Sequence, residues 1–241
     1  MINLLRKKPI LKELIPPGSR DIHNHILPGI DDGAKSLSDT KVLLQGLKDL
    51  GFDSVVATPH TMAGVWENTP ETIKESHHSV TNIASELELP LGYASEYMLD
   101  RCFTDHLEAG LLKVSGKKVL VEMSFIQPPQ DLYELLWSMQ LKGYTPILAH
   151  PERYSYFFND FDSYERLKNA GCDFQLNLMS TVGHYGTEEA KVADKLLKAG
   201  MIDFVATDIH HERHLAVYNN RVKISALDQL EKAFEKTKAL S

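Results

Sequence analysis

Short apolar runs alternate with helical patterns along most of the chain. Most of these runs are almost continuously apolar, as in Val119-Leu120-Val121 and Phe204-Val205-Ala206. Strands that are buried on both faces of a parallel sheet have this pattern. The runs predict strands over residues 20–23, 54–58, 91–96, 118–123, 146–149, 173–178 and 203–207.

Helical periodicity fills the intervals between the predicted strands. Ser36 and Asp39 form a capping-box pattern ahead of an apolar helix face, and Gly51 is placed to end that helix. Thr69 followed by Pro70 predicts the start of a second helix that extends to residue 87. Further helices are predicted over residues 132–141, 161–170, 187–199 and 226–239.

This strand–helix alternation, repeated about seven times, favours an α/β fold whose strands close into a barrel. A doubly wound open sheet is the alternative. No linker or repeat divides the chain, and no glycine-rich nucleotide motif is present. We therefore expect one domain over residues 20–241, preceded by an N-terminal extension over residues 1–19.

Composition narrows the class of protein. The net charge of −7 argues against a broad nucleic-acid surface. No apolar run approaches the roughly 20 residues that a transmembrane helix needs, and the first residues lack the order of a signal peptide. We expect a cytoplasmic protein; a weak peripheral membrane contact through the basic, apolar residues 1–15 is the alternative.

Cysteine chemistry is not expected. Cys102 and Cys172 are too few for a disulfide framework or a cysteine metal knot. Neither begins a Cys-x5-Arg phosphate loop, because Glu108 and Leu178 stand where the arginine would be.

Histidines and carboxylates follow the predicted strands with unusual regularity. In barrels of this type the carboxyl ends of the strands form the active site, so these side chains are expected to meet at one point. Neutral imidazole and carboxylate suit Mn, Fe, Zn or Co, and the donors exceed what one tetrahedral ion needs. Two or three ions are therefore expected. The candidate segments are His23-Asn24-His25, Asp31-Asp32-Gly33, Thr58-Pro59-His60, Glu96, Glu122, His150-Pro151-Glu152-Arg153 and Asp208-Ile209-His210.

These motifs resemble a known family. Asp21 to Gly33, Ala57 to His60, Leu141 to Pro146, Ala149 to Arg153 and Asp208 to His210 are similar to the polymerase and histidinol phosphatase (PHP) superfamily. Within it, the chain is most similar to the manganese-dependent tyrosine phosphatases of bacterial capsule and exopolysaccharide loci, the CpsB/CapC type. The resemblance covers residues 21–211 and implies a distorted (β/α)7 barrel of the PHP type.

The resemblance also implies ligand sets. His23, His25 and Asp208 are expected to hold one metal, and Glu96 to bridge to a second. Glu122 and His150 are expected to complete the second site. A third site is expected from Asp31, His60 and His210, with Asp32 as the alternative to Asp31. The implied ions are two or three Mn²⁺, with Fe, Zn or Co also suited.

Two arginines are expected to bind phosphate by the same resemblance. Arg153 matches the first, and Arg213 is preferred for the second, with Arg221 as the alternative. Trp66 is a candidate for stacking on an aromatic substrate ring, although filling the barrel mouth explains it equally well.

The predicted function is hydrolysis of phosphotyrosine in a protein by a metal-activated hydroxide. The implied partner is the tyrosine-rich tail of a bacterial tyrosine kinase that governs polysaccharide export. The alternatives are a small-molecule phosphomonoesterase acting on histidinol phosphate, a phosphodiesterase, and a non-catalytic binding module. The sequence leaves the oligomeric state open.

Overall fold

Parallel strands form the inner wall of the molecule. The computed structural model describes residues 7–240, and its strands all pair in parallel. The strands are β1 (Ser19–Asp21), β2 (Phe52–Ala57), β3 (His60–Thr61), β4 (Leu91–Tyr93), β5 (Glu96–Met98), β6 (Lys118–Glu122), β7 (Thr145–Ala149), β8 (Asp173–Asn177) and β9 (Phe204–Ala206).

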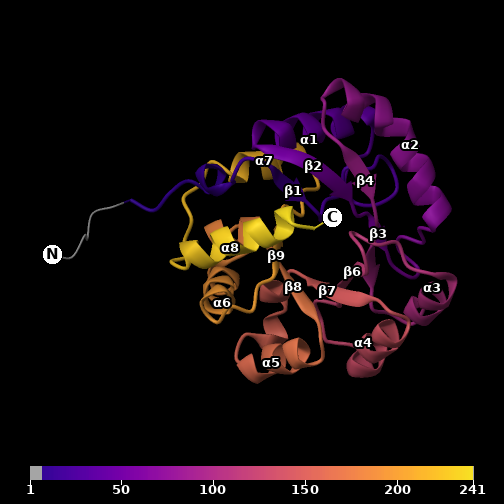
Figure 1. Ribbon diagram of the computed structural model, residues 1–241, viewed down its shortest axis with the longest axis vertical. Coiled ribbons are helices and arrows are strands. Elements are labelled where there is room, and N and C mark those ends of the chain that lie inside the picture. The colour runs from indigo at the N-terminus through magenta and orange to yellow at the C-terminus, as the bar shows by residue number, and fades with distance from the viewer. Residues whose placement is uncertain (1–6, 241) are drawn as a thin grey trace.

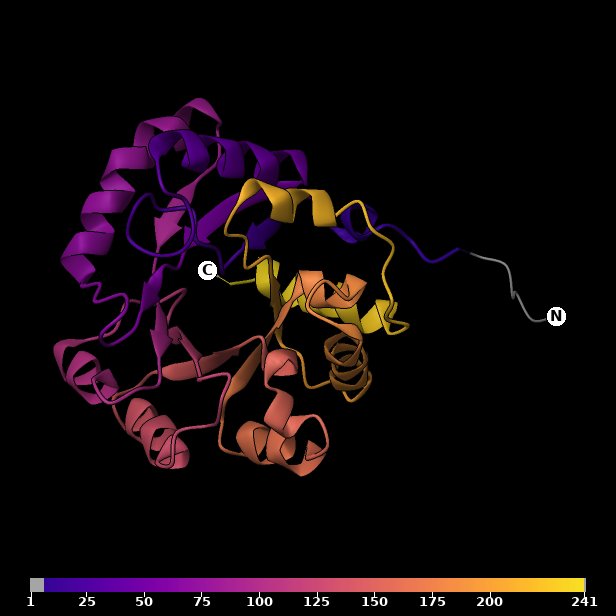
Figure 2. The same ribbon diagram turned by 180° about the vertical axis from the view of Figure 1, so that it is seen from behind.

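The strands fall into two sheets that together make a ring. One sheet has the order β1-β2-β4 and the other β3-β5-β6-β7-β8-β9. An isolated parallel bridge between Asn24 and Ile209 connects the chain after β1 to the chain after β9. Figures 1 and 2 show helices outside this ring, as in a barrel, and not on both faces of an open sheet. The predicted barrel-like α/β class is confirmed, although the ladder of hydrogen bonds is interrupted between the two sheets.

One predicted strand is broken in the structure. Residues 91–96 divide into β4 and β5 because the chain changes partners: Tyr93 pairs with Ala57 of β2, whereas Glu96 pairs with His60 of β3. Pro59 lies between β2 and β3, and it has no N–H to continue a ladder. The short strand β3 was not predicted. The other strands lie within two residues of their predicted ends.

The predicted helices are all present, with the predicted caps. The Ser36 hydroxyl accepts the N–H of Asp39 (3.3 Å), and the Thr69 hydroxyl accepts the N–H of Thr72 (3.3 Å). Two short helices, α3 and α7, were not predicted. The helices are α1 (Leu37–Asp49), α2 (Pro70–Glu86), α3 (Phe103–Ala109), α4 (Leu132–Leu141), α5 (Phe161–Asn169), α6 (Thr187–Lys198), α7 (Glu212–Val217) and α8 (Leu227–Lys238).

Apolar side chains fill both sides of the ring. The larger cluster lies between strands and helices and includes Leu44 and Phe174, which are fully buried. A smaller cluster includes Val56, Leu120 and Ile147, one residue each from β2, β6 and β7. We interpret this second cluster as the filling of the barrel, which leaves the carboxyl ends of the strands for polar side chains.

The described part of the N-terminal extension, residues 7–19, packs against a distant segment of the chain. Backbone N–H groups of Leu11 and Lys12 donate to the carbonyls of Asn220 and Tyr218 (2.9 and 3.0 Å), and Leu11 is fully buried. The extension therefore anchors the chain that follows α7. The alternative of a peripheral membrane contact through residues 1–15 rests partly on residues 1–6, which lie outside the described residues. Within residues 7–240, no helix is both long enough and apolar enough to span a bilayer.

Candidate metal centre

The predicted ligands gather at one end of the strand ring. His23 and His25 follow β1, Glu122 ends β6, His150 follows β7, and Asp208 follows β9. Glu96 begins β5, His60 begins β3, and His210 lies two residues beyond Asp208. A pocket of about 330 Å³ opens over this end.

Four buried donor atoms lie at the centre of the cluster. We call them the donor quartet, and they are His23 Nε2, His25 Nε2, Glu96 Oε2 and Asp208 Oδ1. The His23 nitrogen lies 3.0 Å from the Glu96 oxygen and 3.4 Å from the Asp208 oxygen. The His25 nitrogen lies 3.4 Å from each of the two oxygens and 3.3 Å from the His23 nitrogen. This is the grouping predicted for the first site.

Acceptors behind the two histidines set their tautomers. His23 Nδ1 lies 2.7 Å from Gln175 Oε1, and His25 Nδ1 lies 2.7 Å from Asp31 Oδ2. Because these oxygens only accept, each Nδ1 carries a hydrogen, which leaves Nε2 as the atom that can bind a metal ion. Metal-binding histidines are held in this way by their outer partners.

Glu96 connects the quartet to the groups predicted for the second site. Its Oε1 lies 3.2 Å from His150 Nε2, and its Oε2 also lies 3.2 Å from His60 Nδ1. Glu122 Oε1 lies 2.9 Å from the same His60 nitrogen. Glu122 and His150 therefore both adjoin Glu96, as a bridging role for Glu96 requires.

At the third predicted site the structure places Asp32, and not Asp31, among the histidines. Asp32 Oδ1 lies 3.6 Å from His60 Nε2 and 3.5 Å from His210 Nε2. Both oxygens of Asp31 are engaged elsewhere, with Oδ1 accepting the N–H of Gly33 and Oδ2 contacting His25. Asp31 thus contacts His25 on the side away from the donor quartet, whereas Asp32 faces His60 and His210.

The cluster contains polar atoms that lack hydrogen-bond partners. Among the described residues, Glu96 Oε1 and Oε2, Glu122 Oε1, His60 Nδ1 and His150 Nδ1 are buried without a hydrogen bond of acceptable geometry. His60 Nδ1 lies 3.2 Å from Glu96 Oε2 and 2.9 Å from Glu122 Oε1, so these polar atoms converge on a shared space. Leaving such groups unpaired costs about 1–3 kcal/mol each, and bound cations would satisfy those that converge. The residues present therefore fit a metal centre.

Charge in the cluster favours cations. Burial disfavours ionised Glu96 and Asp208, but nearby histidines, His23 foremost, outweigh burial and hold the pKa of both carboxyls well below its usual value. Burial and the adjacent Arg153 lower the pKa of His150, which keeps its imidazole neutral. The adjacent carboxylates raise the pKa of His23 and His25 in return, so a metal ion that binds these rings would displace a proton from each.

Two of the proposed ligands have strained backbones. His150 has φ of 36° and Asp208 has φ of 52°, a left-handed region in which few non-glycine residues occur. Each directly follows a strand, β7 or β9 (after Thr207), and turns its side chain into the cluster. Such strain costs about 1–3 kcal/mol and is found mainly at functional sites.

Arg153 lies beside the cluster at the pocket wall. Its Nη1 donates to Asp208 Oδ2 at 2.9 Å, and its guanidinium packs 4.0 Å from the ring centre of Tyr185 and 4.8 Å from that of Phe125. The side chain is 22% exposed, so it is held in place and still reaches the pocket. An oxyanion bound over the cluster would meet this guanidinium.

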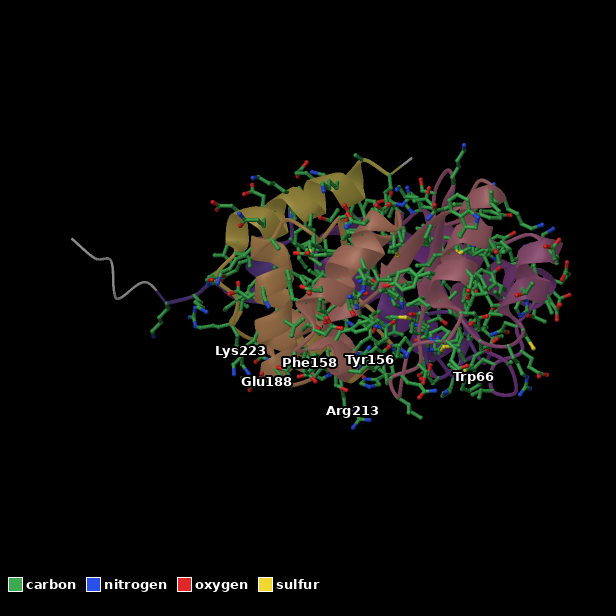
Figure 3. The ribbon with its side chains drawn as sticks, turned by 90° about the horizontal axis from the view of Figure 1, so that it is seen from below. Trp66, Tyr156, Phe158, Glu188, Arg213 and Lys223 are labelled. Atoms are coloured by element: carbon green, nitrogen blue, oxygen red, sulfur yellow. The ribbon has the colours of Figure 1, made fainter. Side chains whose placement is uncertain are left out.

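The other predicted pocket residues lie elsewhere. Arg213 is exposed on α7 and projects away from the body of the molecule (Figure 3), and it does not line the pocket. Arg221 donates to the carbonyl of Lys8. Trp66 does not line the pocket and packs near Lys35 instead. The geometry thus offers neither Arg213 nor Arg221 as a second phosphate ligand.

Two histidines of the segment in which the second arginine was expected line the pocket. His211 and His214 both line the pocket. His214 Nδ1 accepts the backbone N–H of His210 at 3.1 Å, so the hydrogen of the neutral ring is on Nε2. Burial and the neighbouring His211 lower the pKa of His214 to about 3, which keeps the ring neutral. A hydrogen-bond donor other than arginine is therefore available in this wall.

Several supporting residues were not predicted from the sequence. Gln175 and Asn177 lie on β8, the one predicted strand without a candidate ligand, and contact His23 and Asp208. Alternation along β8 points both side chains to the same face, which was the available clue. Phe125 and Tyr185 come from loops whose course the sequence does not predict.

Fold and site together define a class: a barrel-like α/β protein with a candidate multinuclear metal centre at one end of its strand ring. The chain belongs to the CpsB/CapC family of capsular polysaccharide synthesis, whose model matches residues 19–236. The family predicted from the sequence is thereby confirmed.

Individual relatives agree with this assignment. The chain is 29% identical over 218 residues to the tyrosine-protein phosphatase YwqE of Bacillus subtilis, covering 89% of this chain and 84% of the relative. It is 30% identical over 198 residues to the putative tyrosine-protein phosphatase CapC of Staphylococcus aureus, covering 79% and 76%. A crystal structure described as covering YwqE from Bacillus subtilis and CpsB from Streptococcus pneumoniae, unique metal-dependent tyrosine phosphatases, superposes with a TM-score of 0.78 at 30% identity, covering 92% of this chain and 90% of that one.

Proposed function

We propose that this chain is a metal-dependent protein-tyrosine phosphatase. The observation that carries the proposal is the donor quartet with its bridging Glu96, buried beside Arg153 in an open pocket. Membership of the CpsB/CapC family and similarity to relatives that are named tyrosine-protein phosphatases support the same activity.

We assign three adjoining groups of metal ligands. His23, His25, Asp208 and the shared Glu96 form the first; Glu96, Glu122 and His150 form the second. His60, His210 and Asp32 form the third, with Asp32 replacing Asp31. Ions bound there would polarise phosphoryl oxygens and lower the pKa of coordinated water. We propose Mn²⁺, two or three per chain, while Fe, Zn and Co suit the same donors.

The protein's own groups would position the substrate. Arg153 is placed to bind a phosphoryl oxygen, since a guanidinium held by Asp208 and Tyr185 needs little further ordering. His214 is placed to donate from Nε2 to a second oxygen. Phe125, 45% exposed at the pocket edge, offers an apolar surface for the substrate's ring.

The substrate that we propose is a phosphotyrosine protein, and specifically the tail of a bacterial tyrosine kinase in polysaccharide export. The family's role in capsular polysaccharide synthesis supports this partner. We propose the cytoplasm as its compartment; the free thiols of Cys102 and Cys172 are consistent with reducing surroundings. We retain residues 20–241 as the proposed phosphatase domain and residues 1–19 as an extension.

Metal analysis combined with substrate comparison tests this function. Purified protein would be stripped of metal, reloaded with Mn²⁺ and assayed on a phosphotyrosine peptide, histidinol phosphate and a bis-aryl phosphodiester. We expect two to three ions per chain and Mn-dependent phosphate release mainly from the peptide, lost in His23→Ala. Preference for histidinol phosphate or the diester would move the function to those classes. Absence of metal binding would refute the metal centre and favour a binding module.

A further inference from the structure

A second hollow adjoins the pocket that opens over the metal centre, which we call the phosphate pocket. It lies between the loop that leads from β5 into α3 and the loop that leads from β6 into α4, and its volume is about 580 Å³. We call it the loop groove. Its walls include Leu99, Asp100 and Arg101 on one side, and Ser124, Ile126 and residues 127–131 on the other.

One short segment separates the two hollows. Phe125 lines the phosphate pocket, while its neighbours Ser124 and Ile126 line the loop groove. A ligand that enters the pocket past Phe125 and extends beyond it over this segment therefore meets the groove. A phosphotyrosine within a polypeptide always carries such an extension.

The surface of the loop groove suits an apolar side chain. Ile126 is 87% exposed, and the half-buried Pro128 and Pro129 continue the apolar wall beside it. An isoleucine this exposed gains nothing for folding, whereas covering it would remove apolar area from water at about 25 cal/mol per Å². The two prolines also fix the backbone of the wall, which limits the ordering that binding requires.

Among the charged groups of the groove, Arg101 is the one that would favour an acidic ligand. Arg101 is exposed and makes no ion pair within residues 7–240. The adjacent Asp100 is already engaged, because its two oxygens accept the N–H groups of Ala63 (2.7 Å) and Cys102 (2.9 Å). The exposed Asp131, at the start of α4, is the opposing charge and would disfavour an acidic group at its own end.

We propose that the loop groove binds the substrate's polypeptide chain next to the phosphotyrosine, with an apolar side chain on Ile126 and an acidic side chain at Arg101. The inference rests on the proposed tyrosine phosphatase activity and adds a sequence preference to it. Free phosphotyrosine, which has no flanking chain, does not use the groove.

The test compares kcat/KM for free phosphotyrosine with kcat/KM for two phosphotyrosine nonapeptides, using the Mn-loaded enzyme. One peptide carries leucine and glutamate on both sides of the phosphotyrosine, and the other carries serine and lysine at the same positions. We expect the wild-type enzyme to prefer the first peptide by roughly tenfold, the factor that corresponds to one good contact. Ile126→Ser is expected to reduce this preference severalfold, and Arg101→Glu to abolish or reverse it. Neither substitution should change turnover of free phosphotyrosine.

Two exposed residues outside the loop groove provide matched controls for these substitutions. Leu141→Ser changes an apolar residue that is 70% exposed at the end of α4, and Lys191→Glu reverses an exposed charge on α6; both should leave the peptide preference intact. An unchanged preference in both Ile126→Ser and Arg101→Glu, or no preference in the wild type, would overturn the loop groove as a binding site. No hydrolysis of free phosphotyrosine by the wild-type holoenzyme would instead refute the proposed activity.

Discussion

Replacing Asp31 with asparagine tests the division between ligands and the residues that orient them. Asp31 Oδ2 faces His25 Nδ1 at 2.7 Å and accepts the backbone N–H of His60 at 3.2 Å, while Oδ1 accepts from Gly33. Asparagine has the same size but replaces one oxygen with an N–H donor. Either that donor faces the hydrogen on His25, or the amide flips and Gly33 loses its acceptor.

The expected effect follows from the tautomer of His25. To accept from the new amide, His25 must move its hydrogen to Nε2, which turns the atom that faces the donor quartet from a lone pair into an N–H. A hydrogen bond to a charged group contributes about 1.5–3 kcal/mol, and about 1.4 kcal/mol corresponds to a factor of ten. We expect Mn²⁺ affinity and phosphatase activity to fall about 10- to 100-fold, the range seen when such outer partners are removed.

Equilibrium dialysis against Mn²⁺ with elemental analysis, followed by phosphotyrosine-peptide turnover, provides the assay. Asp31→Asn should weaken the quartet but regain full occupancy at high Mn²⁺. Asp32→Asn should lose the ion of the third group more severely. The exposed Asp228→Asn serves as the matched control.

Two outcomes contradict this assignment. Wild-type affinity in Asp31→Asn would mean that Asp31 does not set the tautomer of His25. Loss of one ion per chain in Asp31→Asn, with full stoichiometry in Asp32→Asn, would restore Asp31 as the ligand.

Further predictions concern the pocket wall, pH and the metals. Arg153→Lys keeps the charge but loses the planar packing on Tyr185, so kcat/KM for phosphotyrosine should fall by about tenfold or more, and unchanged kinetics would exclude a phosphate contact. His214→Ala should raise the inhibition constant for inorganic phosphate about tenfold, while Arg213→Ala should leave it within twofold; the reverse result would favour Arg213. Burial raises the pKa of Glu152 to about 7 in the folded protein. Its contribution to the free energy of unfolding is therefore greatest below about pH 4.5 and is lost as the pH rises towards 7. Glu152→Gln should therefore make the metal-free protein more stable than the wild type at pH 8 by about 3 kcal/mol, with little difference at pH 4.5, as measured by urea unfolding; equal stability at both pH values would show that Glu152 is not perturbed. Removing metal with a chelator should lower the Tm by on the order of 10 °C, because unpaired donors remain buried, and an unchanged Tm would argue against bound ions.

The sequence predicted the parts of this fold that depend on local chemistry. Continuous apolar runs and glycine stops located the strands and helices, because these patterns record burial and backbone conformation directly. The ligands that follow strands were also accessible, since parallel strands deliver their carboxyl ends to one place. The sequence could not decide between Asp31 and Asp32. The turn Asp31-Asp32-Gly33 does not show which way either carboxylate points until the loop is folded over His25.

Contacts between distant parts of the chain were the other feature that the sequence did not predict. The exposure of Arg213 and the position of His214 depend on how the short helix α7 packs, and neither residue differs from a pocket residue in sequence pattern. Gln175 acquires its role only because β8 lies next to β7 and β9. Such roles are properties of neighbouring elements and are not encoded in any single segment.

The donor quartet joins residues from the two ends of the chain. His23 and His25 are made early on the ribosome, whereas Asp208 appears only when about nine-tenths of the chain exists. The bridge from Asn24 to Ile209 and the contacts of Leu11 with Asn220 close that same long loop. Contacts of such high sequence separation form late and slowly. A nascent chain that ends before Asp208 therefore lacks the complete donor quartet, so that the first group of metal ligands forms only after this late segment has been added.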